Sequence, residues 1–281
     1  SGLPTVRSTG SEVGHLRPEA ADSTGLLEGT PVTAGMTDGC ASQVSSGAVG
    51  PGDVNTTIGT TLVMKAVSEE LLLDSRGRIY CHRHPEGWWL PGGASNTGAR
   101  CLEEQFGQRE TAERSKTALS ASPTDIVAYP LTGTGERFPF AAPDATGFLL
   151  GSASSRDELF AAYLEGVACV ERLCVEMLQE LGAEPGDTVY SAGGGAASDA
   201  WLQIRADTLN RRVARPAETG AAMGAAIAAA SRRRYSGLSE AGRNMVRIET
   251  TVEPRDDVVE RYEEKFRAFR EECSRRGYTG S

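Results

Sequence analysis

Three glycine-containing turns are the parts of this sequence best suited to chemistry. They are Gly59-Thr60-Thr61, Gly92-Gly93-Ala94-Ser95 and Gly193-Gly194-Gly195-Ala196, and each follows an apolar run. Glycines let backbone N–H groups approach an anion closely, and the N-terminus of a following helix adds partial positive charge. The turns therefore predict contacts to nucleotide phosphates, although a tight connection without any ligand would use the same residues.

The third turn has the most complete context. Thr188-Val189-Tyr190 predicts a buried strand before it, and Ser198 or Asp199 could cap a helix over about 200–209 after it. A second candidate for chemistry is Asp38, which lies between an expected strand over 31–36 and an expected small-residue helix over 39–49. On the residues alone Asp38 is either a general base or the first residue of an Asx turn.

Composition excludes several classes of function. The net charge is −9 and the only basic tract is Arg232–Arg234, which we interpret as a solvated helix end, so a nucleic-acid partner is not expected. No apolar run reaches the length of a membrane span, which is about 18–20 residues. The six cysteines have no zinc-type spacing, so we expect no metal ligands and reduced thiols in a cytoplasmic protein.

The expected elements position these turns. An antiparallel meander of three or four strands is predicted over 54–90, and Ser95 or Asn96 is expected to cap a helix over about 96–106. Apolar steps of three or four residues predict a long helix over 155–181, ended by Gly182. Residues 250–254 are expected to be a connector, and 255–276 a terminal helix with an apolar packing stripe.

Four ordered segments together carry a resemblance to the C-terminal part of an FGGY-family carbohydrate kinase, from Leu3 to at least Ala230. The segments are Thr33–Gly39, Ile58–Thr61, Gly147–Ala168 and Ala192–Trp201. Neither a P-loop nor a dinucleotide-binding glycine motif occurs, so the sequence does not indicate either of those two nucleotide-binding folds. The resemblance implies an α/β fold of the actin/hexokinase-like (ribonuclease H-like) type, with a mixed sheet flanked by helices.

Two further segments, Trp89–Gly98 and Tyr129–Pro139, resemble the D-ribulose kinases within that family. They imply a ketopentose substrate, D-ribulose first and D-xylulose second. The wider resemblance implies that ATP and Mg²⁺ are used, with Asp38 as general base. It implies that the nucleotide is contacted by the first turn (Gly59, Thr60, Thr61), by the second (Gly93, with Thr97 beyond it) and, at the adenosine end, by Gly194, Gly195 and Asp199. Asp199 could equally be only a helix cap, and Glu165 and Gly166 are interpreted as packing residues.

The family's N-terminal D-x-G-[TS] phosphate loop has no counterpart here. We therefore expect residues 1–52 to be the edge of a sugar-side domain, 53–248 to be the ATP-binding domain and 249–281 to be a helical extension. The partners would be ATP, a small sugar and either a second copy of the chain or a missing N-terminal domain. A nucleotide-binding fragment or degenerate kinase subunit without activity of its own is the alternative.

Overall fold

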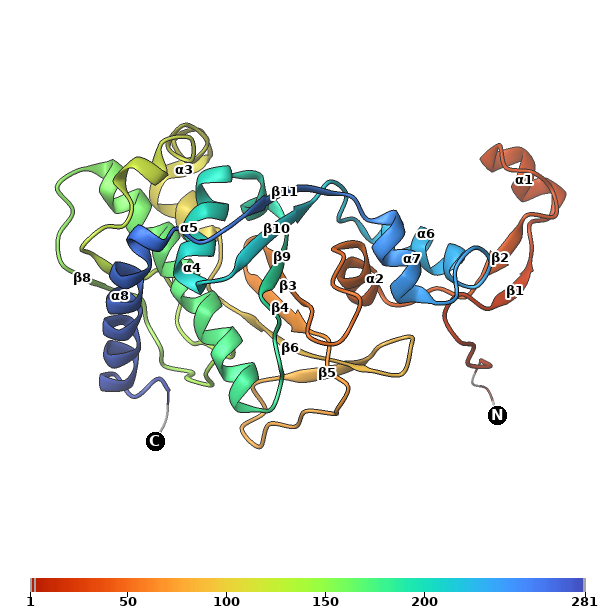
Figure 1. Ribbon diagram of the computed structural model, residues 1–281, viewed down its shortest axis with the longest axis horizontal. Helices are drawn as coiled ribbons and strands as arrows, with labels where there is room; N and C mark the ends of the chain where they lie inside the picture. Colours follow the sequence, from red (N-terminus) through yellow and green to blue (C-terminus); the bar gives the residue numbers. More distant parts are fainter. Residues whose placement is uncertain (1, 3, 280–281) are drawn as a thin grey trace.

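A seven-stranded mixed sheet forms the centre of the computed structural model, which describes residue 2 and residues 4–279 (Figure 1). The strand order is β11-β10-β9-β3-β4-β6-β5. β9 is parallel to both neighbours, β3 and β10, and every other pair in the sheet is antiparallel. The strands are β3 (Val54–Ile58), β4 (Leu62–Ala66), β5 (Tyr80–Arg83), β6 (Trp89–Ser95), β9 (Thr188–Ala192), β10 (Arg212–Pro216) and β11 (Ile248–Val252).

Helices cover both faces of the sheet, which confirms the predicted fold class. One layer shares the main hydrophobic core and comprises α3 (Arg100–Arg114), α4 (Arg156–Glu180), α5 (Asp199–Leu209) and α8 (Asp256–Arg275). The other layer has a smaller core and comprises α2 (Asp38–Ser45), α6 (Ala221–Ser231) and α7 (Leu238–Met245). α2 and α6 approach so closely that a Cβ on Gly224 would lie 2.1 Å from the carbonyl oxygen of Ala41.

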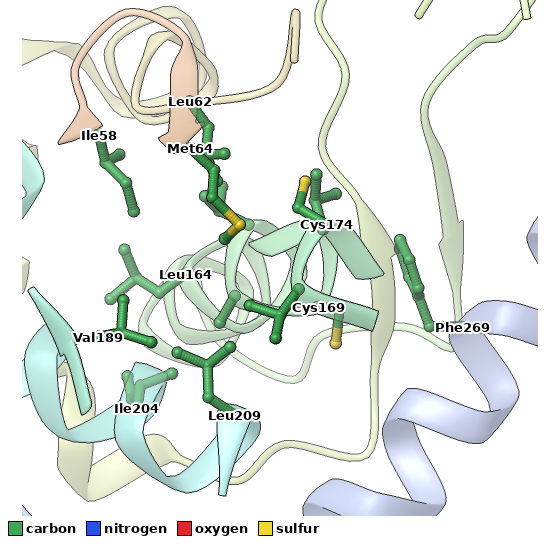
Figure 2. Close-up of a cluster of buried hydrophobic side chains, with 14 of the residues drawn as sticks. Ile58, Leu62, Met64, Leu164, Cys169, Cys174, Val189, Ile204, Leu209 and Phe269 are labelled. Atoms are coloured by element: carbon green, nitrogen blue, oxygen red, sulfur yellow. The ribbon is translucent and has the colours of Figure 1, made fainter. Parts of the chain in front are cut away.

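The main core lies between the sheet and α4. Figure 2 shows Ile58 and Met64, from β3 and β4, facing Leu164 and Cys174 of α4. The predicted bounds of α4, 155–181, agree with the structure to within one residue, and Ser155 caps the helix by accepting a hydrogen bond from the backbone of Glu158. All six cysteines are free, and Cys81 alone among them is not buried. Within the described residues, no helix is both long and apolar enough to cross a membrane.

An N-terminal arm projects from this body (Figure 1). It comprises β1 (Glu12–His15), α1 (Pro18–Thr24) and β2 (Pro31–Thr33), with the two strands paired antiparallel. The apolar side chains of Val6, Leu26 and Leu27 are exposed on it. Ser1 and Leu3, where the expected domain and the resemblance begin, lie outside the described residues, as do the last two residues of the expected extension.

The second glycine turn was predicted wrongly. Gly92 and Gly93 lie inside β6, which continues to Ser95, and the helix that follows begins only at Arg100. Its N-cap residue is Ala99, which has no capping side chain, so Ser95 and Asn96 are not caps. Glycine is needed here because the strands touch: a Cβ on Gly92 would lie 2.0 Å from the carbonyl oxygen of Met64.

Three smaller expectations also differ from the structure. The sheet is not a simple meander, because β4 pairs with β6 and leaves β5 at the edge. The expected connector over 250–254 contains most of β11, which pairs with an unpredicted strand, β10. α2 ends at Ser45 rather than Val49. The region between α3 and α4 contains one short 3-10 helix, η1 (Ala118–Ala121), and two short strands, β7 (Val127–Tyr129) and β8 (Phe148–Leu150).

Other expectations are confirmed. The terminal helix α8 buries Val258, Tyr262, Phe266 and Phe269, so its apolar stripe is a packing face. Arg232–Arg234 follow directly after α6 and are exposed.

Candidate functional site: two glycine turns and Asp38

The first glycine turn joins β3 to β4 and is held by backbone hydrogen bonds. The amide of Gly59 donates to the carbonyl oxygen of Thr61 at 2.9 Å, which closes the turn. The start of α3 is bound to the same turn, because the amide of Ala99 donates to the carbonyl oxygen of Gly59 at 2.8 Å. Thr60, at the tip, is exposed. The turn is therefore rigid and presents a threonine to solvent.

The third glycine turn lies beside the first. β9 is parallel to β3 with Ala192 opposite Thr57, so the two strands end together at one edge of the sheet. Gly193 takes up a positive φ of 81° there, and a Cβ on it would lie 2.6 Å from the carbonyl oxygen of Ile58. Carboxyl ends of parallel strands are where open α/β sheets bind ligands. The structure thus brings together two of the three glycine turns.

The residues after Gly193 divide into buried and open positions. Gly194 is exposed, and no atom would contact a Cβ placed on it. Gly195 is buried, and a Cβ there would contact Ile58 and Trp201. Gly194 and Gly195 begin the short 3-10 helix η2 (Gly194–Ala197), which precedes α5, and Ser198 caps α5 by accepting from the backbone of Trp201. Of the two expected caps, Ser198 is therefore the one used.

Asp199 is the first residue of α5 and has a different partner. Its Oδ1 accepts from Arg215 Nη1 at 2.8 Å, with the Asp199 side chain 77% exposed. The same guanidinium donates to the carbonyl oxygen of Ala196 at 2.9 Å. A surface pocket of about 360 Å³ opens beside this pair, lined by Ser191, Ala192, Gly193, Ala196, Ala197, Arg215, Pro216, Ala217, Thr219 and Glu249. Arg215 was not predicted because its strand, β10, was not.

Gly93 and Thr97 are both buried and contact other segments of the protein. A Cβ on Gly93 would lie 2.4 Å from the ring of Phe138. Thr97 is 1% exposed, and its hydroxyl donates to the carboxylate of Glu136 at 3.2 Å. Ser95 and Tyr129 donate to the same carboxylate, so the end of β6 contacts a buried polar cluster around Glu136. A nucleotide contact through the Thr97 hydroxyl would require that hydroxyl to exchange this partner.

Asp38 lies in the first turn of α2, on the opposite side of the sheet from α4. The carboxylate is exposed, and its Oδ1 accepts from the amide of Gly39 at 2.7 Å. Lys65 of β4 fixes this end of the helix, because its ammonium donates to the carbonyl oxygen of Gly39 at 3.0 Å. Burial lowers the pKa of Lys65, while the negative charge of Asp38 acts to raise it. The only sequence signal for Lys65 is a lysine inside the apolar run of β4.

Two further ionisable side chains complete this corner. Cys40 Sγ lies 3.9 Å from Nδ1 of His82, which is on β5. Burial and the nearby charge of Lys65 both lower the pKa of His82. Among the described residues, no group of three or more histidine, cysteine or acidic side chains is arranged to hold a metal ion.

Comparison with known proteins identifies the scaffold. Residues 54–232, more than half of the chain, match the family described as "FGGY family of carbohydrate kinases, C-terminal domain". The chain belongs to the FGGY family. The match covers both glycine turns and Lys65, whereas Asp38 lies before it.

Relatives within the FGGY family extend the similarity over most of the chain. A xylulose kinase of Bacillus subtilis is 31% identical over 268 residues, which is 92% of this chain and 54% of that protein. A gluconokinase of Bacillus licheniformis is 30% identical over 224 residues, 72% of this chain and 43% of that protein. The crystal structure of xylulose kinase from Rhodospirillum rubrum superimposes with a TM-score of 0.80 at 28% identity, covering 97% of this chain and 57% of that one. The chain spans about half the length of the proteins it matches.

Proposed function

We propose that this chain supplies the ATP-binding side and the general base of an ATP-dependent sugar kinase. The observation that carries the proposal is the parallel pairing of β3 with β9, because it brings the Gly59–Thr61 and Gly193–Gly195 turns to one edge of the sheet. Membership of the FGGY family supports phosphoryl transfer to a sugar hydroxyl. As a division of labour we propose a sugar-side edge over 1–52, an ATP-binding domain over 53–248 and a C-terminal part over 249–281.

The residues present fit a nucleotide. Exposed Thr60 and the open face of Gly194 leave backbone and hydroxyl groups available to phosphate oxygens. The pocket beside Gly193 would take the adenosine end, with Arg215 in its wall and Asp199 bound to Arg215. Mg²⁺ would accompany ATP as a phosphate-bound ion that keeps several waters. Contacts from Gly93 and Thr97 belong to the proposal as well, and they would require these two buried residues to become exposed to the nucleotide.

Asp38 is the proposed general base. A sugar hydroxyl that attacks a γ-phosphoryl group loses its proton, and a carboxylate within reach can accept it. The exposed Asp38 carboxylate is free on one oxygen, since only Oδ1 has a protein hydrogen bond among those of the described residues. The other groups supply position and charge, which account for most of the catalysis in phosphoryl transfer.

The proposed acceptor is a ketopentose, D-ribulose or D-xylulose. The D-ribulose assignment depends on the segments Trp89–Gly98 and Tyr129–Pro139, whereas the similarity to xylulose kinases favours D-xylulose. D-gluconate is the third sugar to assay, because a gluconokinase is also similar. We further propose a cytoplasmic location, which the six free cysteines support.

A second function, nucleotide binding without turnover, is favoured by the length of the match. The chain spans about half the length of its relatives, so a partner could supply the side of the active site that faces the ATP-binding turns. That partner would be an N-terminal kinase domain or a second copy of the chain, and the exposed apolar residues of the arm offer a surface for either.

One experiment separates the two functions. ADP release from the full chain is measured with ATP and Mg²⁺, with and without each of the three sugars, and ATP binding is measured by calorimetry on the same sample. Release that depends on a ketopentose supports the kinase. ATP binding without sugar-dependent release supports the fragment, and absence of ATP binding contradicts both.

A further inference from the structure

Lys65 is a buried cation beside the proposed base. It is 6% exposed and is the fourth residue of the five-residue strand β4, Leu62–Ala66. Its ammonium has one protein acceptor among the described residues, the carbonyl oxygen of Gly39 at 3.0 Å. Burying a lysine costs desolvation free energy, and such a residue is usually kept because its ammonium is paired or has a function.

The space between α2 and the sheet is polar around this lysine. Asn55 lies opposite Lys65 across the strands, and Gln43 lies one helical turn beyond Gly39 on α2. Each buries a side-chain oxygen, Asn55 Oδ1 and Gln43 Oε1, that has no hydrogen-bond partner among the described residues. Asn55 is therefore a second buried polar residue at the Lys65 position of the β3–β4 pair.

The ionisable groups that face Lys65 come from two elements. α2 contributes Asp38 and Cys40, and β5 contributes His82. Asp38 carries a carboxyl group, whereas Cys40 carries a thiol and His82 an imidazole. β6 contributes no charge here, because its residue against the Lys65 stem is Gly92. Burial lowers the pKa of Lys65, and the charges of Cys40 and Asp38, both on α2, act to raise it.

We propose that Lys65 is a positioning residue for Asp38, holding the first turn of α2 on the β3–β4 hairpin and placing a positive charge beside the carboxylate. The inference rests on the proposed role of Asp38. It links the base to the phosphate turn physically, because β4 begins directly after Gly59–Thr61. A shift of the helix by one ångström would misalign the carboxylate and the acceptor hydroxyl.

The first test needs no activity. The sequence contains three lysines, Lys65, Lys116 and Lys265, so the side chains of selectively ¹³C,¹⁵N-labelled lysine can be followed individually by NMR across pH. Asp38→Asn removes the facing negative charge, so the pKa of Lys65 should fall. Asp144→Asn, at an exposed aspartate between β7 and β8, is the matched control and should leave it unchanged. Equal Lys65 titration in the wild type and Asp38→Asn would overturn the proposal.

The second test uses the full chain in single-turnover transfer from ATP to D-ribulose or D-xylulose. Lys65→Met should lower the rate about 100-fold with ATP affinity unchanged, and Lys65→Arg should restore part of it. An unchanged rate in Lys65→Met overturns the proposal. The pKa of His82, which Lys65 lowers, should rise in Lys65→Met and reports that this variant is folded. If the wild type transfers no phosphoryl group, the proposed function fails, while the lysine titration still decides the role of Lys65.

Discussion

Arg215 forms an ion pair with Asp199, Nη1 to Oδ1 at 2.8 Å, and lines the pocket beside Gly193. The pair joins the end of β10 to the first turn of α5, and Arg215 also binds the carbonyl oxygen of Ala196. One guanidinium therefore binds both Ala196, in the wall of the proposed adenosine pocket, and Asp199, at the start of α5. Substitutions of Asp199 and Arg215 can therefore distinguish a ligand contact at Asp199 from a purely structural role.

Asp199→Asn should change stability little. The Asp199 side chain is largely exposed, and exposed ion pairs contribute about 0.2–1 kcal/mol. Arg215→Met should be more damaging, because it also removes the bond to Ala196. ATP affinity of both variants is measured by calorimetry and their free energy of unfolding by urea titration. A loss of ATP affinity in Asp199→Asn without a loss of stability identifies a ligand contact, whereas unchanged affinity leaves Asp199 structural.

Gly193 and Gly194 should respond differently to the same substitution. Gly193→Ala should lower the free energy of unfolding by about 1–3 kcal/mol, because φ is positive and the new methyl group would meet the carbonyl oxygen of Ile58. Gly194→Ala is the matched control and should stay within about 0.5 kcal/mol of the wild type, since its Cβ would meet open space. Urea denaturation checks both. Similar losses in the two variants would show that the turn is not built as described.

The buried ion pair between Lys265 of α8 and Glu165 of α4 should stabilise the fold only while both partners are present. Lys265 donates to Glu165 Oε2 at 2.7 Å and to Thr124 Oγ1 at 2.9 Å, and Glu165 is fully buried. Lys265→Met leaves that carboxylate unpaired and should cost about 3–5 kcal/mol. Adding Glu165→Gln should recover part of the loss. Denaturant titration of both variants is the measurement, and a further loss in the double variant would contradict the pairing.

Stability should fall on acidification through His84. The side chain is 1% exposed and packs on Trp88, and its burial lowers the pKa of His84 to about 4. In the unfolded chain the pKa of a histidine is about 6.5, so between these values the unfolded state binds more protons than the native state. Stability is therefore complete above about pH 6.5, falls between about pH 6.5 and 4, and this contribution levels off below.

The size of the His84 contribution is roughly 2–3 kcal/mol across that window. His84→Leu removes the titrating group and should flatten the dependence of unfolding free energy on pH. Urea titrations at pH 4.5, 5.5 and 7 compare the two proteins, whose other titrating groups are the same. Parallel curves for the wild type and the variant would contradict the assignment.

The features that depend on local pattern could be predicted from the sequence. The β3–β4 hairpin has two β-rich runs around a short turn, and α4 combines an apolar stripe with a serine cap. The misses arise from tertiary contacts. Gly92 and Gly93 are typical turn residues, yet they lie in β6 because neighbouring atoms exclude a side chain there. β11 lies at the edge of the sheet and carries the polar run Glu249-Thr250-Thr251. β10 carries arginines at 212 and 215. Neither sequence therefore shows the continuous apolar run of a buried strand.

The site was predicted unevenly for the same reason. Glycines and Asp38 have recognisable local signals, whereas Arg215 depends on a strand pairing and Lys65 on a helix that packs from elsewhere in the chain. Glu165 and Gly166 were correctly interpreted as packing residues, since Glu165 is paired internally and a Cβ on Gly166 would lie 2.4 Å from the carbonyl oxygen of Ala128. Contacts between distant segments therefore decide the parts of the site that the pattern does not show.

Asp38→Asn tests the central claim most directly. Ketopentose-dependent ADP release and ATP affinity are measured side by side for the full chain and this variant. The amide keeps the size of the carboxyl group but cannot accept the hydroxyl proton, so turnover should fall by about 10²–10⁴-fold while ATP affinity stays nearly the same. Turnover equal to that of the wild type would contradict the assignment of Asp38 as the base.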